Sequence, residues 1–291
     1  MLKRFRLLKP TVGPLISNTS NIQRTPVHIP RVLDLSLSDR VSVLFSRFFA
    51  DQIQLRPIHR QLEDVNWRLG QDDGNLRALF PPRITPEMVF PSSLDALARD
   101  ILTNWETTGH RSLSSRLLQT LRTTPIFKVV HSFLASVDEV ITNVDNFIDC
   151  LSHVWFSHTA ADLLQYPHGP KTCGFQHVFI GERKRNIKGL HSWQRLFILE
   201  REGRLITRRV IKKSPDFHIA ALNFELDKTP KPYGTIFFGL PMDFEMMILF
   251  VAFMMTKNRP ITFMLVGRPV TIESYDLALI DNAMSTAFFK Y

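Results

Sequence analysis

The periodicity of apolar residues changes once along this chain, and that change limits the folds open to it. From Leu35 to about Leu164, apolar residues recur at the three- and four-residue spacing of amphipathic helices. In LSDRVSVLFSRFFADQI, for example, Ser38 or Asp39 can cap the first turn. After Pro167–Cys173 the apolar residues follow a period of two, which is typical of strands. Helices first and strands later predict an α+β fold.

The predicted elements divide the chain into three stretches. After a Gly-, Pro- and Asp-rich loop at Gly70 to Pro91, the further helices predicted are Leu94–Trp105, Leu113–Leu121, Pro125–Leu134 and Val137–Leu164. The predicted strands are HSWQRLFILE, RLITRRVI, FHIAALNFEL, GTIFFGL, ITFMLVG and PVTIESY, interrupted by a helix at Asp243–Thr256. We therefore expect a basic N-terminal tail at 1–33 and one domain at 34–291. Within that domain, residues 34–172 would form a helical half and residues 173–291 a β-rich half of antiparallel sheets.

The N-terminal stretch is basic and free of acid. Residues 1–33 hold six lysines and arginines, and the first acidic residue is Asp34. This composition fits a mitochondrial presequence as well as a basic tail, and both interpretations stay open. Lys9 and Pro10 interrupt any apolar core, so no secretory signal is expected and an intracellular location is favoured. The longest apolar run, Met246–Met255, has ten residues, which predicts a buried helix because a membrane span needs about twenty.

The net charge of +9 is unevenly distributed. Residues 34–173 carry 13 Lys and Arg against 16 Asp and Glu, whereas residues 174–291 carry 17 against 11. Residues 183–213, here called the basic strip, hold eleven cations and two acidic residues. Such a strip favours a polyanionic partner such as nucleic acid, and an anionic membrane or protein surface is the alternative.

Two histidines flank the first four cations of the basic strip. His177 and His191 are 14 positions apart, and each lies among large apolar residues. On adjacent strands of a hairpin they would meet in space, and we expect that arrangement. A histidine titrates near pH 6.5, so one can be neutral while the other is protonated. Such a pair can cleave an RNA phosphodiester as base and acid, with Lys231 as a fixed cation for the charge that develops on the phosphate.

Four blocks in a fixed order carry a resemblance to a known family. They are GFQHVFIGE, GLHSW, FELDKTPKPYGTIFFGLPMDFE and VTIESYD. Their order resembles the signature of the EndoU family of poly(U)-specific, XendoU-like endoribonucleases, to which the coronaviral uridylate-specific nuclease is more distantly similar. RLLQTLRTTPIFKVVHSFL and FIDCLSHVWF resemble the helical half of the family, and LRALFPP its earlier loop. The resemblance covers about Leu35 to Tyr291.

The resemblance implies an activity and three catalytic residues. The activity is uridylate-specific cleavage of RNA on the 3′ side of uridines, leaving a 2′,3′-cyclic phosphate and a 5′-hydroxyl. His191 would be the general base, His177 the general acid and Lys231 the cation that stabilises the transition state. The partner would be single-stranded, uridine-containing RNA. Dependence on Mn²⁺ or another divalent cation is also implied, but the sequence shows no cluster of ligands and no metal residue is predicted.

Five further residues belong to the same blocks. Thr235 matches a Ser/Thr position associated with uracil recognition, and a period of two would place it on the same strand face as the lysine four positions earlier. Ser274 and Tyr275 match the late block, in which a tyrosine packs at the nucleotide. Glu182 keeps a carboxylate of the first block. Trp193 belongs to the second block. Glu182 and Trp193 are both expected to support the site.

The chain departs from the family pattern at a few positions. Gln176 stands where the family has Glu, and Leu190 and Ser192 replace Phe and Asn around the second histidine. The missing carboxylate permits an alternative, a catalytically weakened RNA-binding pseudoenzyme of the same fold. Cys150 and Cys173 are too far apart for a CxxC motif, so the sequence leaves open whether they pair or remain thiols.

Overall fold

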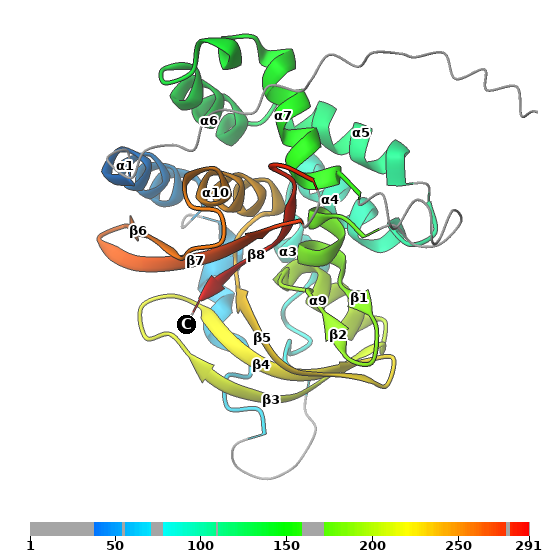
Figure 1. Cartoon of the computed structure of the whole chain (residues 1–291). Coiled ribbons are helices and arrows are strands. Elements are labelled where there is room, and N and C mark those ends of the chain that lie inside the picture. Colours follow the sequence, from blue (N-terminus) through cyan, green and yellow to red (C-terminus); the bar gives the residue numbers. More distant parts are fainter. Residues whose placement is uncertain are drawn as a thin grey trace, which may run out of the picture.

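The structure is a computed structural model of the chain (Figure 1). It describes residues 38–53, 56–70, 78–108, 110–158, 172–277 and 280–290. The tail predicted at 1–33 lies outside these residues, as does the stretch 159–171, which includes the predicted end of the helix at Val137–Leu164. Within the described residues, that prediction is α-helical only at Val144–Phe156. The division of the domain at 172/173 stays a prediction.

Helices form most of the first part of the described chain. The starts of α4, α6 and α7 are fixed by side chains that accept hydrogen bonds from the first turn. Ser92 and Asp95 form a reciprocal capping box on α4, and Thr124 caps α6 just before Pro125. The helices are α1 (Ser38–Phe48), α2 (Pro57–Gln61), α3 (Pro86–Val89), α4 (Ser93–Asn104), α5 (His110–Leu121), α6 (Pro125–Ala135) and α7 (Val144–Phe156). Short π- and 3₁₀-helical turns lie at Phe49–Ile53, Leu62–Asp64 and Glu139–Thr142.

Antiparallel strands dominate the second part. One sheet has the order β3-β4-β5, a second has the order β6-β7-β8, and β1 pairs with β2 in a short hairpin. The strands are β1 (Glu182–Arg183), β2 (Ile187–Lys188), β3 (Leu205–Lys213), β4 (Ile219–Leu226), β5 (Thr229–Phe237), β6 (Ile261–Leu265), β7 (Arg268–Asp276) and β8 (Met284–Lys290). The predicted α+β class is confirmed, and β8 is a strand that the sequence analysis missed.

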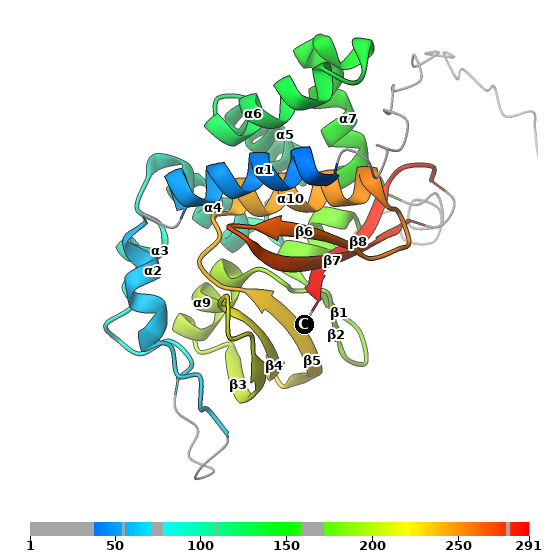
Figure 2. The same cartoon turned by 90° about the vertical axis from the view of Figure 1, so that its left-hand side faces the viewer.

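The two three-stranded sheets meet along β5 and β8. Figures 1 and 2 show the two strands side by side near the centre of the molecule. Phe237 of β5 and Phe289 of β8 pack edge to face at this junction, with ring centroids 5.0 Å apart. Residues far apart in the chain are therefore held at fixed positions where the two sheets touch.

The apolar run in the second part forms a central helix, α10 (Met242–Met255). All of its residues are buried, because it packs between α6 on one side and β7 and β8 on the other. A helix that is apolar on every side belongs in a core, as predicted. Within the described residues, no helix has the length and apolarity of a membrane span.

One predicted strand is a helix. HSWQRLFILE contains α9 (Trp193–Arg201), which begins after Ser192, whose side chain accepts from the backbone N–H of Arg195. Every residue from Trp193 to Leu199 is buried, so the helix shows no polar face in the sequence. Without that face, the apolar pattern was wrongly interpreted as a strand.

Both cysteines are buried, free thiols. Cys150 lies in α7 and Cys173 just before the π-helical turn Gln176–Ile180. Burial raises the pKa of each thiol to about 12, so neither is an activated nucleophile.

Candidate active site

The backbone brings the segments of the two histidines together without a hairpin. His177 lies in the π-helical turn Gln176–Ile180, and His191 lies in the turn before α9. The N–H of Leu190 donates to the carbonyl of His177 at 2.8 Å, and the N–H of His191 donates to that of Val178 at 2.7 Å. The expectation that both histidines stand on strands is therefore wrong, although the expected proximity of their segments is correct.

A glycine makes this close approach possible. Gly189 has a positive φ of 62°, and a Cβ at this position would lie 1.7 Å from the carbonyl oxygen of His177. The next residue, Leu190, also has a positive φ, of 61°, which is uncommon for a residue other than glycine. Backbone strain of this kind concentrates at functional sites. Here it turns the chain so that His191 points into the junction of the sheets.

His191 lies in a dry environment. Its side chain is 8% exposed, and its ring stacks on Phe288 of β8 with centroids 5.2 Å apart and an interplanar angle of 16°. Nδ1–H donates to the carbonyl of Thr235 at 2.9 Å. Because a carbonyl oxygen only accepts, Nδ1 carries the hydrogen and Nε2 keeps its lone pair. His191 is therefore arranged as a proton acceptor at Nε2.

Electrostatics reinforce the neutral state of His191. Burial lowers the pKa of His191 to about 3, and the charge of Lys231 and, more weakly, that of His177 act in the same direction. The backbone hydrogen bond to Thr235 opposes this shift only in part. Lys231 and His177 thus both lie within electrostatic reach of His191.

His177 has the opposite kind of partner. Its Nδ1–H donates to the Glu182 carboxylate at 2.7 Å, and its side chain is 20% exposed, against 6% for Glu182. Burial tends to raise the pKa of Glu182, but the hydrogen bond and charge of His177 and the nearby Lys184 outweigh it and lower that pKa. An anionic carboxylate at Nδ1 stabilises an imidazolium, which can then donate from Nε2. Glu182 is thus in direct contact with His177, and its supporting role stays a prediction.

Lys231 enters the site from β5. The residue is 6% exposed, and its stem crosses Gly234, where a Cβ would lie 2.4 Å from Lys231 Cε. Burial, together with the charge of Lys188 on β2, lowers the pKa of Lys231 to about 8. Within the described residues its ammonium group has no carboxylate partner. The cation is left available for an anionic ligand.

A bulge in β5 changes the spacing argument for Thr235. On β4, Leu222 pairs with Gly234 and Phe224 pairs with Lys231, so three steps along β5 match two along β4. The period of two is broken between Lys231 and Thr235, and their shared face does not follow from the four-residue spacing. Thr235 is 5% exposed and contributes its carbonyl to His191.

The late block contributes one exposed ring. Tyr275 is 41% exposed, and its ring lies near that of Phe288, with centroids 6.5 Å apart and planes at 25°. Ser274 is 1% exposed, and its carbonyl accepts the N–H of Asn258, which ties β7 to the turn after α10. His191, Phe288 and Tyr275 therefore form a row of rings that runs from the site toward solvent.

Phe288 was absent from the residues that the sequence analysis proposed. It lies in the run MSTAFFK, whose threonine and aromatic residues are typical of strands. That composition was the available signal for β8. The contact of Phe288 with His191 has no counterpart in the sequence, because it depends on how the two sheets meet.

Two buried neighbours complete the surroundings of the histidines. Trp193 is 1% exposed, and its Nε1–H donates to the carbonyl of Leu240 at 2.6 Å, which anchors the start of α9 beyond the end of β5. Gln176 is 7% exposed, and its Oε1 has no hydrogen-bond partner within the described residues. The amide at Gln176 thus adds no charge beside His177.

The residues around the histidines do not fit a metal site. Among the described residues, no three His, Cys, Asp or Glu side chains come together as ligands. His177 and Glu182 form a pair that is already joined by a hydrogen bond. The implied Mn²⁺ therefore has no set of side-chain ligands in this part of the molecule.

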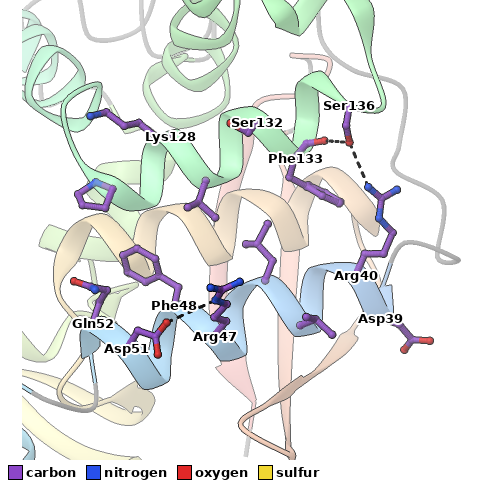
Figure 3. Close-up of a pocket in the computed structure, with 14 residues that line it drawn as sticks. Asp39, Arg40, Arg47, Phe48, Asp51, Gln52, Lys128, Ser132, Phe133 and Ser136 are labelled. Carbon is purple, nitrogen blue, oxygen red and sulfur yellow. Dashed lines mark hydrogen bonds and ion pairs between the residues drawn. The ribbon is translucent and has the colours of Figure 1, made fainter.

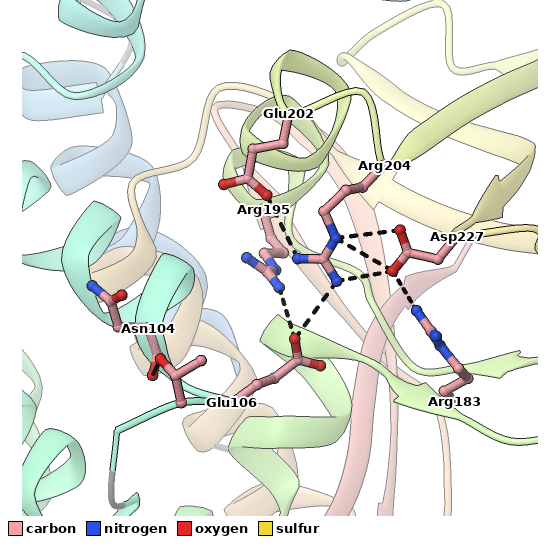
Figure 4. A network of polar contacts seen from close by, with 8 residues as sticks. Asn104, Glu106, Arg183, Arg195, Glu202, Arg204 and Asp227 are labelled. Atoms are coloured by element: carbon pink, nitrogen blue, oxygen red, sulfur yellow. Dashed lines mark hydrogen bonds and ion pairs between the residues drawn. The ribbon is translucent and has the colours of Figure 1, made fainter.

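The basic strip is not a single charged face. Arg195 is 1% exposed and faces Glu106 at 3.7 Å, and Arg204 contacts both Glu106 and Asp227 (Figure 4). Arg183 of β1 reaches the same Asp227. Several cations of the basic strip are thus paired with carboxylates of the protein itself. The ion pairs form a network that joins the β1–β2 hairpin to the turn between β4 and β5.

A groove elsewhere in the molecule contains none of the expected residues. It has a volume of about 1070 Å³ and lies between α1 and α6, over apolar side chains such as Leu44, Phe48 and Phe133 (Figure 3). The groove holds no histidine. Its charged side chains, Asp39, Asp51, Arg40, Arg47 and Lys128, belong to a groove with no pair of histidines, and Arg47 pairs with Asp51. The histidine cluster, which has a neutral and a carboxylate-paired imidazole, is the better candidate for acid and base chemistry.

Comparison with known proteins gives consistent matches. The family model described as endoribonuclease XendoU matches residues 95–289. The chain is 27% identical over 177 residues to a poly(U)-specific endoribonuclease of Xenopus tropicalis, covering 58% of each chain. It is 27% identical over 205 residues to a uridylate-specific endoribonuclease of Mus musculus, covering 65% of this chain and 48% of the relative. The chain thus matches about half the length of these relatives.

A solved structure shares the fold. The structure of XendoU, described as a splicing-independent snoRNA-processing endoribonuclease, superposes with a TM-score of 0.65 at 20% identity. The match covers 86% of this chain and 95% of that chain. At this identity the likeness supports the fold alone.

Proposed function

Because this chain belongs to the XendoU family, we propose that it is an RNA endonuclease that cleaves on the 3′ side of uridines. One observation carries the proposal: two neighbouring histidines have opposite partners at Nδ1. His191 donates to a backbone carbonyl in a buried environment, whereas His177 donates to the Glu182 carboxylate. These surroundings suit a base and an acid, respectively.

The proposed reaction is an internal transesterification. The 2′-oxygen of the uridine forms a bond to phosphorus while Nε2 of His191 takes the proton of the 2′-hydroxyl. The bond between phosphorus and the 5′-oxygen breaks, and that oxygen receives a proton from Nε2 of His177. The products are a 2′,3′-cyclic phosphate and a 5′-hydroxyl. General acid and base catalysis of this kind contributes about 10²–10⁴-fold each.

Lys231 supplies the electrostatic part of the mechanism. Negative charge grows on the non-bridging oxygens of the phosphorane-like transition state, and a fixed cation in a poorly hydrated site stabilises it strongly. The ammonium of Lys231 is held by a stem packed over Gly234 and has no carboxylate to neutralise it within the described residues.

Uridine choice is proposed to involve Thr235, Ser274 and Tyr275. The exposed ring of Tyr275 lies at the outer end of the row formed with Phe288 and His191, and it offers a stacking surface for a base. Stacking is nearly indifferent to base identity, so the Thr235 hydroxyl would supply the discrimination. Stimulation by Mn²⁺ is proposed on the family alone, and no step of the mechanism uses it.

The test is incubation of the full chain with a short single-stranded RNA that has one uridine, with and without Mn²⁺. We expect one cut after the uridine, with both end groups identified by mass. The control is the same RNA with 2′-deoxyuridine, which lacks the nucleophile and should stay intact. Binding of the RNA without cleavage in either condition would favour the pseudoenzyme. Absence of binding would favour a protein that acts on another polyanion.

The role of Thr235 needs a separate readout. On an RNA of mixed sequence, Thr235→Ala should spread the cuts from uridine toward cytidine and adenosine while cleavage remains measurable. An unchanged distribution of cut sites would show that Thr235 contributes only its backbone carbonyl.

A further inference from the structure

The site has two chemically different sides. His191 faces the junction of the sheets, where Thr235, Phe288 and the row toward Tyr275 lie. His177 faces the β1–β2 hairpin through Glu182, the first residue of β1. A substrate bound between the two histidines therefore has the sheet junction at one end and the hairpin at the other.

The reaction gives this arrangement a direction along the RNA, if the proposed function holds. The base takes a proton from the 2′-hydroxyl, so the uridine lies on the side of His191. The acid gives a proton to the 5′-oxygen of the next nucleotide, so that nucleotide lies on the side of His177. The RNA on the 3′ side of the cut must then continue toward the hairpin.

The hairpin carries four cations, and two of them are already engaged. Arg183 pairs with Asp227, and Lys184 lies 3.2 Å from Oε2 of Glu182. Arg185 and Lys188 are exposed, and within the described residues their side chains make neither ion pair nor hydrogen bond. Two free cations thus remain on the side where the 3′ part of the RNA would leave.

Lys188 is the better placed of the two. It pairs across the hairpin with Glu182, and directly opposed residues lie on the same face of a two-stranded ribbon. That is the face from which Glu182 reaches His177. The strand β2 also lies against β5, and the charge of Lys188 acts on Lys231. The two lysines therefore lie near each other beside the histidines, and within the described residues neither forms an ion pair.

The hairpin is also held in a fixed position. Arg183 and Arg204 both contact Asp227 in the turn between β4 and β5, and Arg204 is bound in turn by Glu106 and Glu202 (Figure 4). This network fixes β1–β2 relative to β5, the strand of Lys231. The backbone that carries Lys188 is then already positioned, and only its side chain loses freedom when it binds an anion.

From this geometry we infer that Lys188 forms a subsite for the phosphate that follows the first nucleotide on the 3′ side of the cut. Lys231 holds the phosphate that reacts, and Lys188 holds the next phosphate along the chain. The ligand class is a phosphate group of RNA, recognised by charge and independent of the base. The inference rests on the proposed function for the direction of the chain, but the anion site itself does not require cleavage.

The test compares two substrates that differ by one phosphate. UpA contains only the phosphate that reacts, and UpAp adds one phosphate on the 3′ side of adenosine. The wild-type protein should show a kcat/KM for UpAp that is about tenfold higher than for UpA, the size expected for one hydrogen bond to a charged group. In Lys188→Ala the ratio of the two kcat/KM values should fall to about one. Lys188→Arg keeps the charge and should keep most of the preference for UpAp.

Lys128→Ala provides the matched control. Lys128 is exposed on α6 at the remote groove, so its loss changes the net charge equally and should leave the ratio as in the wild type. The inference is overturned if the wild-type protein has equal kcat/KM for UpAp and UpA. It is also overturned if Lys188→Ala lowers kcat/KM for both substrates by the same factor, so that their ratio is unchanged.

Failure of the proposed function would be recognised separately, because wild type would then cleave neither substrate. In that case the uncleavable dUpdA and dUpdAp are compared by binding. Tighter binding of dUpdAp that disappears in Lys188→Ala supports the subsite. Equal binding of both ligands by wild type refutes it.

Discussion

The surroundings of His191 and His177 differ in almost every respect that sets the behaviour of an imidazole. His191 is 8% exposed, stacked on an aromatic ring and hydrogen bonded to a neutral carbonyl. His177 is partly open to solvent and hydrogen bonded to a carboxylate. Two identical side chains thus have opposite surroundings. Under the proposed function, burial suits His191 to the role of base, and the counter-charge of Glu182 suits His177 to the role of acid.

Removing either imidazole should have the largest effect. His191→Ala and His177→Ala should each lower the rate of RNA cleavage by at least about 10²-fold, because each proton transfer would lose its catalyst. RNA affinity should change little, since Lys231 and Lys188 remain. The measurement is single-turnover cleavage of a uridine-containing oligonucleotide, with circular dichroism to verify that each variant is folded.

A second substrate separates the two roles. In uridine 3′-(4-nitrophenyl phosphate) the leaving group is a stable phenolate, which departs without a proton. His177→Ala should therefore cleave this substrate at nearly the wild-type rate, whereas His191→Ala should remain impaired because the 2′-hydroxyl still needs a base. The reverse pattern would exchange the assigned acid and base.

The next effect concerns Lys231, the proposed cation for the negative charge that develops on the phosphate. Lys231→Ala should lower cleavage about 10²-fold after every base alike. Burial lowers the pKa of Lys231 to about 8, so the ammonium is charged below that pH and loses its charge as the pH rises through it. On the nitrophenyl substrate, where no acid is needed, the wild-type rate should fall above about pH 8.

Lys231→Arg is the control for that pH dependence. Guanidinium stays charged throughout the accessible range, so this variant should lose the alkaline fall even if its rate is lower. A fall at the same pH in Lys231→Arg would show that another group titrates there.

Much of this fold follows from periodicity alone. The helices α4 to α6, the buried helix α10 and the strands β3, β4, β6 and β7 lie close to where the apolar patterns predict them. The helix α7 is much shorter than the predicted Val137–Leu164, and β5 begins at Thr229, before the predicted GTIFFGL. The resemblance to a family also predicted that His177, His191 and Lys231 share one site. These features were accessible because each depends on residues near one another in the chain or on a short motif.

The rest depends on tertiary contacts. The helix α9 is buried on every side, including Gln194 and Arg195, so its sequence lacks the polar face that marks a helix. The bulge in β5 is visible only in the pairing with β4. The ring of His191 stacks on Phe288, a residue 97 positions away, and no local sequence pattern predicts that contact.

That contact supports the smallest of the expected effects, a shift along the pH axis. His191 acts as a base only when it is neutral, and burial lowers its pKa to about 3, so the acidic limb of the wild-type profile should lie well below pH 6. Phe288→Leu should admit water to the ring and weaken the desolvation that lowers this pKa. The pKa should then rise toward the ordinary value of 6.5, and the acidic limb should move up by about one pH unit.

The profile of kcat/KM against pH on the nitrophenyl substrate measures this limb directly, because proton donation by His177 does not contribute to it. Tyr275→Leu is the matched control, since it removes the ring one place farther along the row and leaves Phe288 over His191. Tyr275→Leu should weaken binding of the nitrophenyl substrate without shifting the acidic limb of the profile. If Phe288→Leu also leaves the limb in place, the stacked ring does not contribute to the dry environment of His191. The low pKa of the base would then come from the rest of its surroundings, including Lys231, whose charge also lowers it.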